Sequence, residues 1–573
     1  RQWPSVEYRG VFINDEDWSS RVWAKNISGK HAKDGEMGPP FYRRLFTLLL
    51  RLRANAFWPA MHEGTTAFFK VKGNRELADS CDMVVGTSHC EPMLRNNVGE
   101  SDEKKRGAFN FITNRHNVTE YWSERLRETA SMDALYTIGM RGIHDGSMQG
   151  VKTAEEKLNG LQSVIDEQRK LMHKHLGRKP ADIPQVFVPY KEVLEIYENG
   201  LRVPDDVTLM WCDDNYGYLT RLSDSLQQKR SGGAGVYYHL SYWGRPHDYL
   251  WLTTTQPGLI CNEMKTAYDH NARRLWILNV HDPKVAAYGM SLFLDMAWNI
   301  NCVSPSTVGN HLHAWLAQQF GQAAASKLLP AMKSFYRLCG IRRPEFMGWS
   351  QVELDKKKYN RGLSPMSDTE FAADEFGNEL ERYLNSYEEI KAQVAEAEKL
   401  IRPELADAFF AAIKYPVFSA AAMATKTLQA QEARHIGRPD SFNSDEEALD
   451  AALRSYNAYQ EILSLTEYYN NRMSGGRWRG SMSCAPRKLP VFGEPLFPAP
   501  LSEDNKNSHA PAAPIETKLQ TDGCIVRNAC QWHSASAGAY VVDLLGHSNK
   551  AVALPKGESL TYQINTTRTD SCV

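Results

Sequence analysis

Carboxylate, amide, histidine and cationic side chains recur just after short apolar runs in the first 300 residues of the sequence. Two carboxylic acids that face a sugar can hydrolyse its glycosidic bond, one as the acid and the other as base or nucleophile. Aromatic rings beside them suit a pocket with apolar walls and a few placed polar groups. The sequence therefore favours glycoside hydrolysis. The candidate site residues are Asp17, Trp58, His89, Arg141, Asp145, Tyr190, Lys191, Glu192, Asp214, Asn215 and His239.

Three of these residues, Arg141, Lys191 and His239, add cationic or donor groups that a neutral sugar does not need. The carboxylate of a uronic acid forms charge-assisted hydrogen bonds with such groups. The sequence has no nucleophile elbow around Ser or Cys, and its histidines and carboxylates lack a recognised zinc spacing such as His-Glu-x-x-His. We therefore expect neither an acyl-enzyme nucleophile nor a metal or other cofactor.

Each candidate also has a simpler structural explanation. An acidic residue after a strand commonly caps the next helix, which is the alternative for Asp17 and Asp214. The rings of Trp58, Trp211 and Trp243 are alternatively part of a hydrophobic core. Polar groups that follow all eight apolar runs nevertheless favour one polar-ligand pocket over eight unrelated caps.

The apolar runs are continuous rather than alternating, which is typical of parallel strands buried on both faces. Amphipathic segments such as 42–53, 120–132 and 154–176 separate several of them. Eight such repeats in roughly 270 residues predict an α/β protein with a (β/α)8 TIM-type barrel, whose site lies at the carboxyl ends of the strands. The expected strands are Tyr8–Asn14, Ala54–Ala60, Met83–Ser88, Tyr136–Arg141, Gln185–Tyr190, Thr208–Cys212, Gly235–Leu240 and Leu275–Val280.

After Val280 the strand pattern gives way to segments rich in Ala, Glu and Leu, which predict a helical bundle. Past Ser474, Pro and Gly punctuate short β-like runs such as Tyr540–Leu544. We therefore predict a catalytic barrel over residues 1–300, a helical bundle domain over 301–474 and an incomplete β-rich C-terminal region over 475–573.

The overall composition argues against a nucleic acid or a membrane as the binding partner. The 573 residues carry a formal net charge of −1, whereas nucleic-acid binding needs a basic excess. No run of about 18 apolar residues is present, so we expect no membrane-spanning helix. The expected partner is a polysaccharide or oligosaccharide.

Several motifs resemble those of the family 115 glycoside hydrolases, the xylan α-1,2-glucuronidases. The resemblance runs in order along nearly the whole chain. Members of that family usually carry an α/β domain before the barrel, whereas this sequence begins almost at the first strand. The matching stretches are Arg9–Trp18, Gly86–Arg95, Gly139–Asp145, Val188–Val193, Trp211–Gly217, Tyr238–Gly244 and Gly475–Gly480.

The resemblance implies an inverting hydrolase that removes α-1,2-linked (4-O-methyl-)glucuronic acid from xylan. It implies Glu192 as the general acid, and either Asp145 or Asp17 as the base that activates water. Substrate-binding positions then include His89, Arg141, Asn215 and His239, together with Trp58, Tyr190, Lys191 and Asp214.

Two alternatives to xylan hydrolysis remain open at this stage. One is the same chemistry on another glucuronic-acid-bearing glycan, such as an arabinogalactan. The other is a non-catalytic glycan-binding barrel, although a binding pocket has no need of an acid and a base. We further expect glucuronoxylan as substrate, a homodimer and a secreted or periplasmic location.

Overall fold

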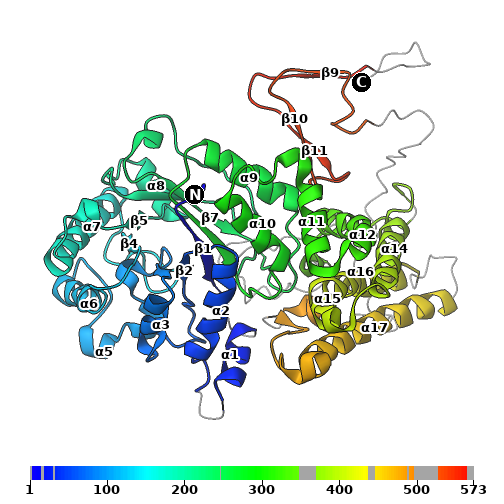
Figure 1. The fold of residues 1–573 in the computed structure, drawn as a ribbon, viewed down its shortest axis with the longest axis horizontal. Helices are drawn as coiled ribbons and strands as arrows, with labels where there is room; N and C mark the ends of the chain where they lie inside the picture. The colour runs from blue at the N-terminus through cyan, green and yellow to red at the C-terminus, as the bar shows by residue number, and fades with distance from the viewer. Residues whose placement is uncertain are drawn as a thin grey trace, which may run out of the picture. The chain divides into compact units, whose positions relative to one another are not determined.

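The computed structural model describes residues 3–14, 19–29, 33–244, 247–347, 370–373, 375–436, 445–486, 489–495 and 527–563. The chain divides into two compact units (Figure 1). The sheet unit comprises Arg1–Thr255, Leu259–Ser304 and Trp478–Ser483. The helical unit comprises Gln256–Gly258, Pro305–Arg477 and Cys484–Val573. The predicted division into three domains, with boundaries at 300 and 474, stays a prediction.

The sheet unit contains eight parallel strands in the order β3-β2-β1-β8-β7-β6-β5-β4. This is the neighbour order of a (β/α)8 barrel, in which the first and the last strand lie side by side. The edge strand β3 meets the chain just before β4 through one isolated parallel bridge, Val85 to Ala134. All eight predicted strands are confirmed, most of them shorter than expected. They are β1 (Tyr8–Ile13), β2 (Ala56–Trp58), β3 (Val84–Val85), β4 (Tyr136–Ile138), β5 (Gln185–Phe187), β6 (Thr208–Cys212), β7 (Ala234–His239) and β8 (Leu275–Val280).

Helices cover the outer side of this sheet, as Figure 1 shows for α2, α6 and α7. The predicted helix at 154–176 is confirmed as α7, and Thr153 begins it with a capping box to Glu156. The helices are α1 (Ser20–Ser28), α2 (Pro39–Arg51), α3 (Asn74–Ser80), α4 (Asn97–Glu100), α5 (Glu103–Arg106), α6 (Arg115–Glu128), α7 (Ala154–Leu176), α8 (Glu192–Glu198), α9 (Pro257–Asp269) and α10 (Ala287–Trp298).

The inner side of the sheet is filled by alternate side chains of the strands. Because helices cover the other side, the strand residues between them are also apolar, which explains the continuous runs in the sequence. The tightly packed interior residues include Phe12, Trp58, Val186, Met210, Tyr237 and Ile277. The polar groups of the predicted site follow directly on these strands.

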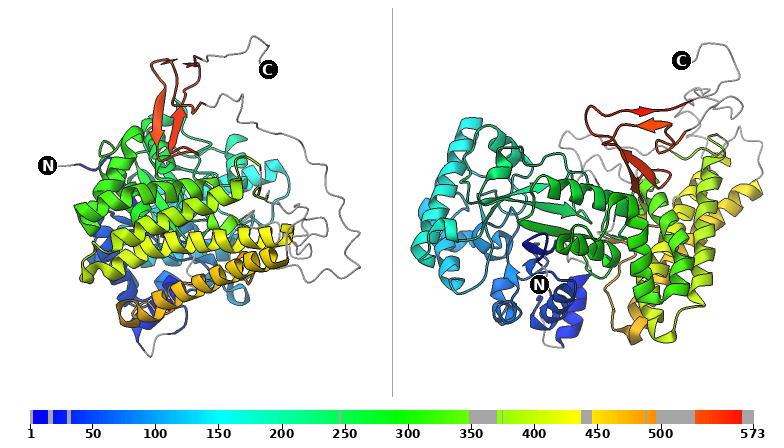
Figure 2. Two further views of the ribbon diagram at one scale, coloured as in Figure 1. Left: turned by 90° about the vertical axis from the view of Figure 1, so that its right-hand side faces the viewer. Right: turned by 45° about the horizontal axis from the view of Figure 1, so that its top comes forward.

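The helical unit is a bundle of long helices. In Figure 2, α12, α14, α16 and α17 run side by side, and α12 with α14, α14 with α16 and α16 with α17 are in contact. Short π-helical stretches at Phe410–Lys414 and Tyr468–Arg472 interrupt the α-helical pattern. Its helices are α11 (Val308–Phe320), α12 (Gln322–Ile341), α14 (Glu379–Glu398), α15 (Ala406–Phe409), α16 (Tyr415–Ile436) and α17 (Asp445–Glu467).

One helical stretch of the bundle, Pro403–Arg434, is long and apolar enough to cross a membrane. In this stretch, 67% of the most apolar window is buried inside the protein. Burial of that extent is typical of a core helix in a bundle, and we read the stretch in that way.

The C-terminal residues of the helical unit form two small antiparallel pairs. The strand β10 (Tyr540–Asp543) pairs with β11 (Lys550–Ala553), and β12 (Leu560–Thr561) pairs with β9 (Ser534–Ala535). The β-like run predicted at 540–544 is therefore confirmed.

A segment from far along the chain, Trp478–Ser483, returns to the sheet unit. The ring of Trp478 stacks on that of Trp23 with centroids 4.8 Å apart, and Lys284 Nζ lies 4.1 Å from the Trp478 centroid. The Asn26 amide donates to the Arg479 carbonyl at 2.6 Å, and Ser19 Oγ donates to the Ser481 carbonyl at 2.7 Å. The segment Trp478–Ser483 thus stabilises the region of α1, which follows β1 in the sequence.

Candidate active site

The guanidinium of Arg141, just past β4, joins two carboxylates at the carboxyl ends of the strands. Its Nε and Nη2 atoms donate to Oε1 and Oε2 of Glu192 at 2.8 and 2.9 Å, and Nη1 donates to Oδ1 of Asp145 at 2.7 Å. The Arg141 side chain is 3% exposed, whereas Glu192 and Asp145 are 31% and 38% exposed. The buried guanidinium of Arg141 therefore holds the partly exposed carboxylates of Glu192 and Asp145 in place.

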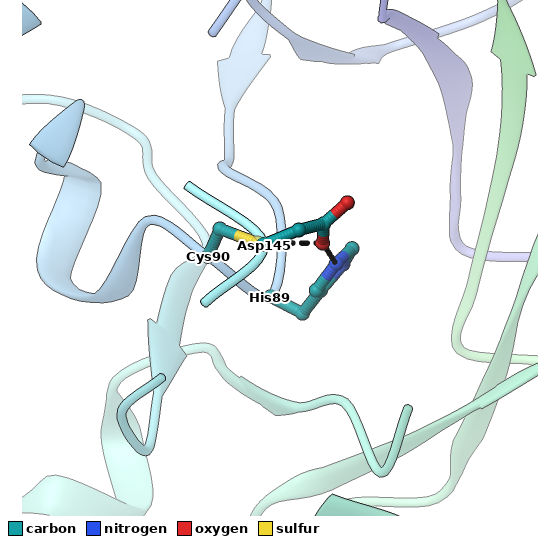
Figure 3. Close-up of side chains that lie close together, drawn as sticks. All are labelled: His89, Cys90 and Asp145. Atoms are coloured by element: carbon teal, nitrogen blue, oxygen red, sulfur yellow. Dashed lines mark hydrogen bonds and ion pairs between the residues drawn. The ribbon is translucent and has the colours of Figure 1, made fainter. Parts of the chain in front are cut away.

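Three neighbouring side chains contact Asp145 besides Arg141. His89 Nε2 and Cys90 Sγ each lie 3.4 Å from Asp145 Oδ1 (Figure 3), and Lys191 Nζ lies 3.7 Å from Oδ2. Burial alone would raise the pKa of Asp145, but His89, Lys191 and Arg141 hold that pKa well below its usual range.

The charge that stabilises the Asp145 carboxylate comes from Arg141 and Lys191. Burial lowers the pKa of His89 below its usual value, so near neutral pH the imidazole contributes a hydrogen bond but no charge. Burial would also lower the pKa of Arg141, but its hydrogen bond to Glu192 and the nearby acidic groups raise that pKa instead. Arg141 is therefore permanently cationic.

The donor atoms of His89, Cys90 and Asp145 all lie within 4.8 Å of one another, which is close enough to bind one metal ion. Arg141 Nη1, however, contacts both Asp145 Oδ1 and Cys90 Sγ, the latter at 3.4 Å. Burial raises the pKa of the Cys90 thiol well above its usual value, and a thiol is a poor metal ligand. The cluster therefore suits hydrogen bonding to a polar ligand better than it suits a divalent cation.

His239, the last residue of β7, is paired with Asp213, the first residue after β6. His239 Nδ1 contacts Asp213 Oδ1, and Asp213 Oδ2 accepts from the backbone N–H of His239 at 3.2 Å and of Gly217 at 3.0 Å. Both side chains are almost fully buried, at 2% and 0% exposed. Asp213 therefore fixes the orientation of the imidazole.

Asp214, which we predicted as a substrate-binding residue, has a different position. Its Oδ1 atom accepts from the backbone N–H groups of Tyr216 at 2.9 Å and Tyr218 at 3.1 Å. The residue is exposed and stabilises the turn after β6. Asp214 therefore stabilises a turn rather than capping a helix, and the acidic residue in contact with the predicted histidine is Asp213.

Two tyrosines position Asn215. Tyr190 OH donates to Asn215 Oδ1 at 2.6 Å, and Tyr249 OH donates to the Asn215 carbonyl at 2.6 Å. Asn215 has a φ of 75°, a left-handed conformation that asparagine tolerates better than most residues. Burial raises the pKa of Tyr190, which therefore stays a hydrogen-bond donor.

A pair of histidines flanks Asp145 at the mouth of the sheet unit. His62 Nδ1 lies 2.9 Å from His144 Nε2, and the ring of Trp243 lies 4.8 Å from His62 and 5.8 Å from His144. His144 has a φ of 55°, which costs conformational energy in a residue other than glycine. The contact with His62 thus joins the loop after β2 to the loop that carries Asp145.

One of the two remaining candidates, Trp58, lies outside this cluster. Trp58 is 0% exposed, and its ring packs against Phe12 at 5.8 Å and Tyr237 at 5.7 Å in the interior of the sheet. Its position fits the core explanation rather than a sugar-binding surface. Asp17 lies outside the described residues, so its role stays a prediction.

The strand-end residues absent from our candidates are Asp213, His62, His144, Cys90 and Trp243. Asp213 lies one position before Asp214, which we had predicted instead. Because β6 ends at Cys212, the alternation of side chains along the strand no longer predicts which way the next side chains point. His62 and His144 are 82 residues apart, so no local signal pairs them. The aspartate pair after β6 was nevertheless a signal that pointed to the correct turn.

The sequence and the structure were compared with known proteins. The sequence profile of glycosyl hydrolase family 115 matches residues 1–346. A comparison with curated proteins gave no match.

Solved structures resemble this one to different extents. BtGH115A, described as a family GH115 4-O-methyl-α-glucuronidase with specificity for decorated arabinogalactans, has a TM-score of 0.86 and 42% identity over 99% of this chain and 70% of its own. The family 89 glycoside hydrolase from Clostridium perfringens shares the fold, with a TM-score of 0.51 and 10% identity over 81% of this chain and 55% of its own. The profile match and the 42% identity lead to one conclusion: this chain belongs to glycoside hydrolase family 115.

Proposed function

We propose that this glycoside hydrolase removes α-linked glucuronic acid, with or without a 4-O-methyl group, from a plant polysaccharide, and that its substrate is glucuronoxylan with an α-1,2 linkage. The observation that supports the proposal most directly is the arrangement of Glu192 and Asp145 on the single guanidinium of Arg141. Two partly exposed carboxylates beside buried donors are what hydrolysis of a glycosidic bond requires.

The uronate carboxylate is bound by Lys191 in this proposal. The three guanidinium nitrogens of Arg141 already donate hydrogen bonds to Glu192 or Asp145. Arg141 therefore mainly positions these two carboxylates. Lys191 is 38% exposed, and the carboxylate that its ammonium group contacts in the described part of the chain is that of Asp145, with Oδ2 at 3.7 Å. A second carboxylate, from the sugar, can approach it and form a charge-assisted hydrogen bond. His239 and Asn215 would hold sugar hydroxyls.

Glu192 donates a proton to the leaving oxygen in this mechanism, and a carboxylate removes a proton from the attacking water. We assign the second role to Asp145 because its carboxylate is ionised and partly exposed beside Glu192, and Asp17 remains the alternative. Water attacks the anomeric carbon from the face opposite the leaving group, so the α-linkage yields a β-product and the configuration inverts. We place these groups at the mouth of a closed (β/α)8 barrel.

An arabinogalactan decorated with glucuronic acid is the second candidate substrate. The similarity to BtGH115A, whose printed specificity is for decorated arabinogalactans, supports this alternative. We also propose a homodimer and a secreted or periplasmic location, where polymeric glycans are accessible.

Release of uronic acid from defined polymers tests the proposal. Purified protein is incubated with glucuronoxylan, with 4-O-methyl-glucuronoxylan, with decorated arabinogalactan and with neutral arabinoxylan, and the released acid is measured by anion-exchange chromatography. We expect release from a glucuronoxylan and none from the neutral polymer. Release from decorated arabinogalactan alone would show that the substrate is the second candidate and not xylan. Release from none of the polymers would refute the proposal.

A further inference from the structure

A cleft in the helical unit has the features of a second binding site. It is a shallow, open cleft at the protein surface. Its lining includes Arg337 on α12, Phe371, Glu379, Arg382 and Tyr383 on or before α14, and His547 between β10 and β11. We propose that this cleft is an accessory site that binds a uronate residue of a polysaccharide.

The aromatic wall of the cleft is held in place by its neighbours. Tyr383 OH donates to the Leu338 carbonyl at 3.1 Å, and the ring of Tyr383 lies 4.8 Å from that of Phe371. The side-chain amide of Gln431 bonds both the backbone N–H and the carbonyl of Phe371, at 3.2 and 2.5 Å. The wall is therefore formed before any ligand binds, which lowers the entropic cost of binding.

The charged groups of the cleft leave a positive excess. Arg382 donates to the backbone carbonyls of Gly377 at 3.2 Å and Phe376 at 2.8 Å, which fixes its guanidinium without neutralising it. Within the described part of the chain, Arg337 has no hydrogen-bond or ion-pair partner. The acid of the lining, Glu379, accepts from the backbone N–H of Ala372 at 3.0 Å. Two guanidinium groups therefore border the cleft without a carboxylate partner among the described residues.

This combination selects the chemical class of the ligand. Two guanidinium groups favour a carboxylate, which they bind by charge-assisted hydrogen bonds. The imidazole of His547 beside them can hydrogen-bond a hydroxyl group, and the buried rings of Phe371 and Tyr383 form an apolar floor. A uronate residue has both parts, whereas a neutral sugar leaves both cations unpaired. The inference rests on the proposed function in one respect: the enzyme's substrate is a glycan that carries such residues.

Binding of sodium glucuronate to the full-length protein tests the inference, with glucose and inorganic phosphate as comparison ligands. Isothermal titration should detect two glucuronate sites in the wild type and one in the Arg337→Gln/Arg382→Gln variant. Arg337→Gln alone, which removes no internal hydrogen bond, should weaken one site about tenfold or more. Lys327→Gln is the matched control, since Lys327 is an exposed cation on the same helix and lies outside the cleft lining.

A second readout separates this cleft from the active site. The Arg337→Gln variant should hydrolyse a short uronic-acid-bearing oligosaccharide at the wild-type rate but show a higher KM on the polymer. Equal glucuronate stoichiometry in wild type and both variants overturns the inference, as does phosphate or glucose binding that matches glucuronate. If no polymer yields uronic acid but Arg337→Gln still loses a glucuronate site, the proposed function fails and the accessory site stands.

Discussion

The carboxylate of Asp213 contacts three N–H groups, those of the His239 imidazole, the His239 backbone and the Gly217 backbone. A carboxylate can accept at both of its oxygens, and this pairing fixes the tautomer in which His239 Nδ1 carries the proton. In the proposed function, His239 Nε2 then accepts a hydrogen bond from a sugar hydroxyl. The acidic residue thus acts through the histidine.

Asp213→Asn should lower kcat/KM about tenfold to a hundredfold, the loss expected for one hydrogen bond that involves a charged group. An amide has only one acceptor oxygen, so it cannot satisfy both sets of N–H groups. Asp214→Asn is the matched control, because its Oδ1 atom can still accept from Tyr216 and Tyr218. Steady-state kinetics of the two variants test this relationship, and equal losses in both would refute it.

Glu192→Gln should reduce turnover on polymeric substrate by orders of magnitude, since an amide cannot protonate the leaving oxygen. The loss should be much smaller on an aryl glucuronide, whose phenolate leaves without protonation. Glu195→Gln, an exposed position on α8, serves as control and should keep wild-type rates on both. Near-normal hydrolysis of the polymer by Glu192→Gln removes this residue from the mechanism.

Glu91, which is 2% exposed, has a pKa raised well above its usual value, mainly by burial and also by the charge of Glu100. A carboxyl group whose pKa is higher in the folded state binds its proton more tightly there. It therefore stabilises the fold below its unfolded pKa of about 4.3, and this contribution is lost as the pH rises toward the folded value.

Glu91→Gln should therefore unfold at higher urea concentration than the wild type near pH 7, and the difference should shrink toward about pH 4. Glu100→Gln provides the contrast, because Glu100 pairs with Arg95 at 2.7 Å and Arg125 at 2.5 Å in the interior. Removing that charge should lower the free energy of unfolding by about 3–5 kcal/mol. A wild type that is as stable as Glu91→Gln at both pH values would contradict the assignment.

Proton NMR of the first sugar released decides the stereochemistry. The proposed water attack predicts that the β-anomer accumulates first and that the α-anomer then grows by mutarotation. An initial excess of the α-anomer would mean retention through a covalent intermediate. In that case one carboxylate of the pair is a nucleophile, and the assignment of an activated water is wrong.

The sequence predicted the sheet unit well because its strands are apolar on both faces. Leu275–Val280 and Thr208–Cys212 were located to the residue, since helices cover one side and the interior covers the other. The length of β3 was overestimated, because the predicted run 83–88 included Gly86, Thr87 and Ser88, which follow the strand Val84–Val85. The helix 154–176 was also exact, since Thr153 and Glu156 mark its start.

The side-chain network was harder to predict than the strands. Arg141, Asp145 and Glu192 were placed in one site because parallel strands end on the same side. The sequence could not show that Arg141 bonds both carboxylates, because this depends on side-chain directions in loops. It left open whether Trp58 packs inward, because a run that is apolar on both faces does not show which face its last residue occupies. The contact between His62 and His144 involves a left-handed backbone conformation at His144. The residue types around this position do not predict that conformation.

The return of Trp478–Ser483 to the sheet unit has a consequence for how this protein is made. A ribosome finishes the eight strands long before it reaches Trp478, and at about 5–20 residues per second the interval is roughly 10–40 seconds. During that time Trp23 lacks its stacking partner, and Ser19 and Asn26 lack the carbonyls that they bond in the finished protein. The nascent sheet unit thus stays incomplete until a segment encoded after the whole helical bundle has been synthesised. A gene fragment that stops at Ser304 would leave it in that state permanently.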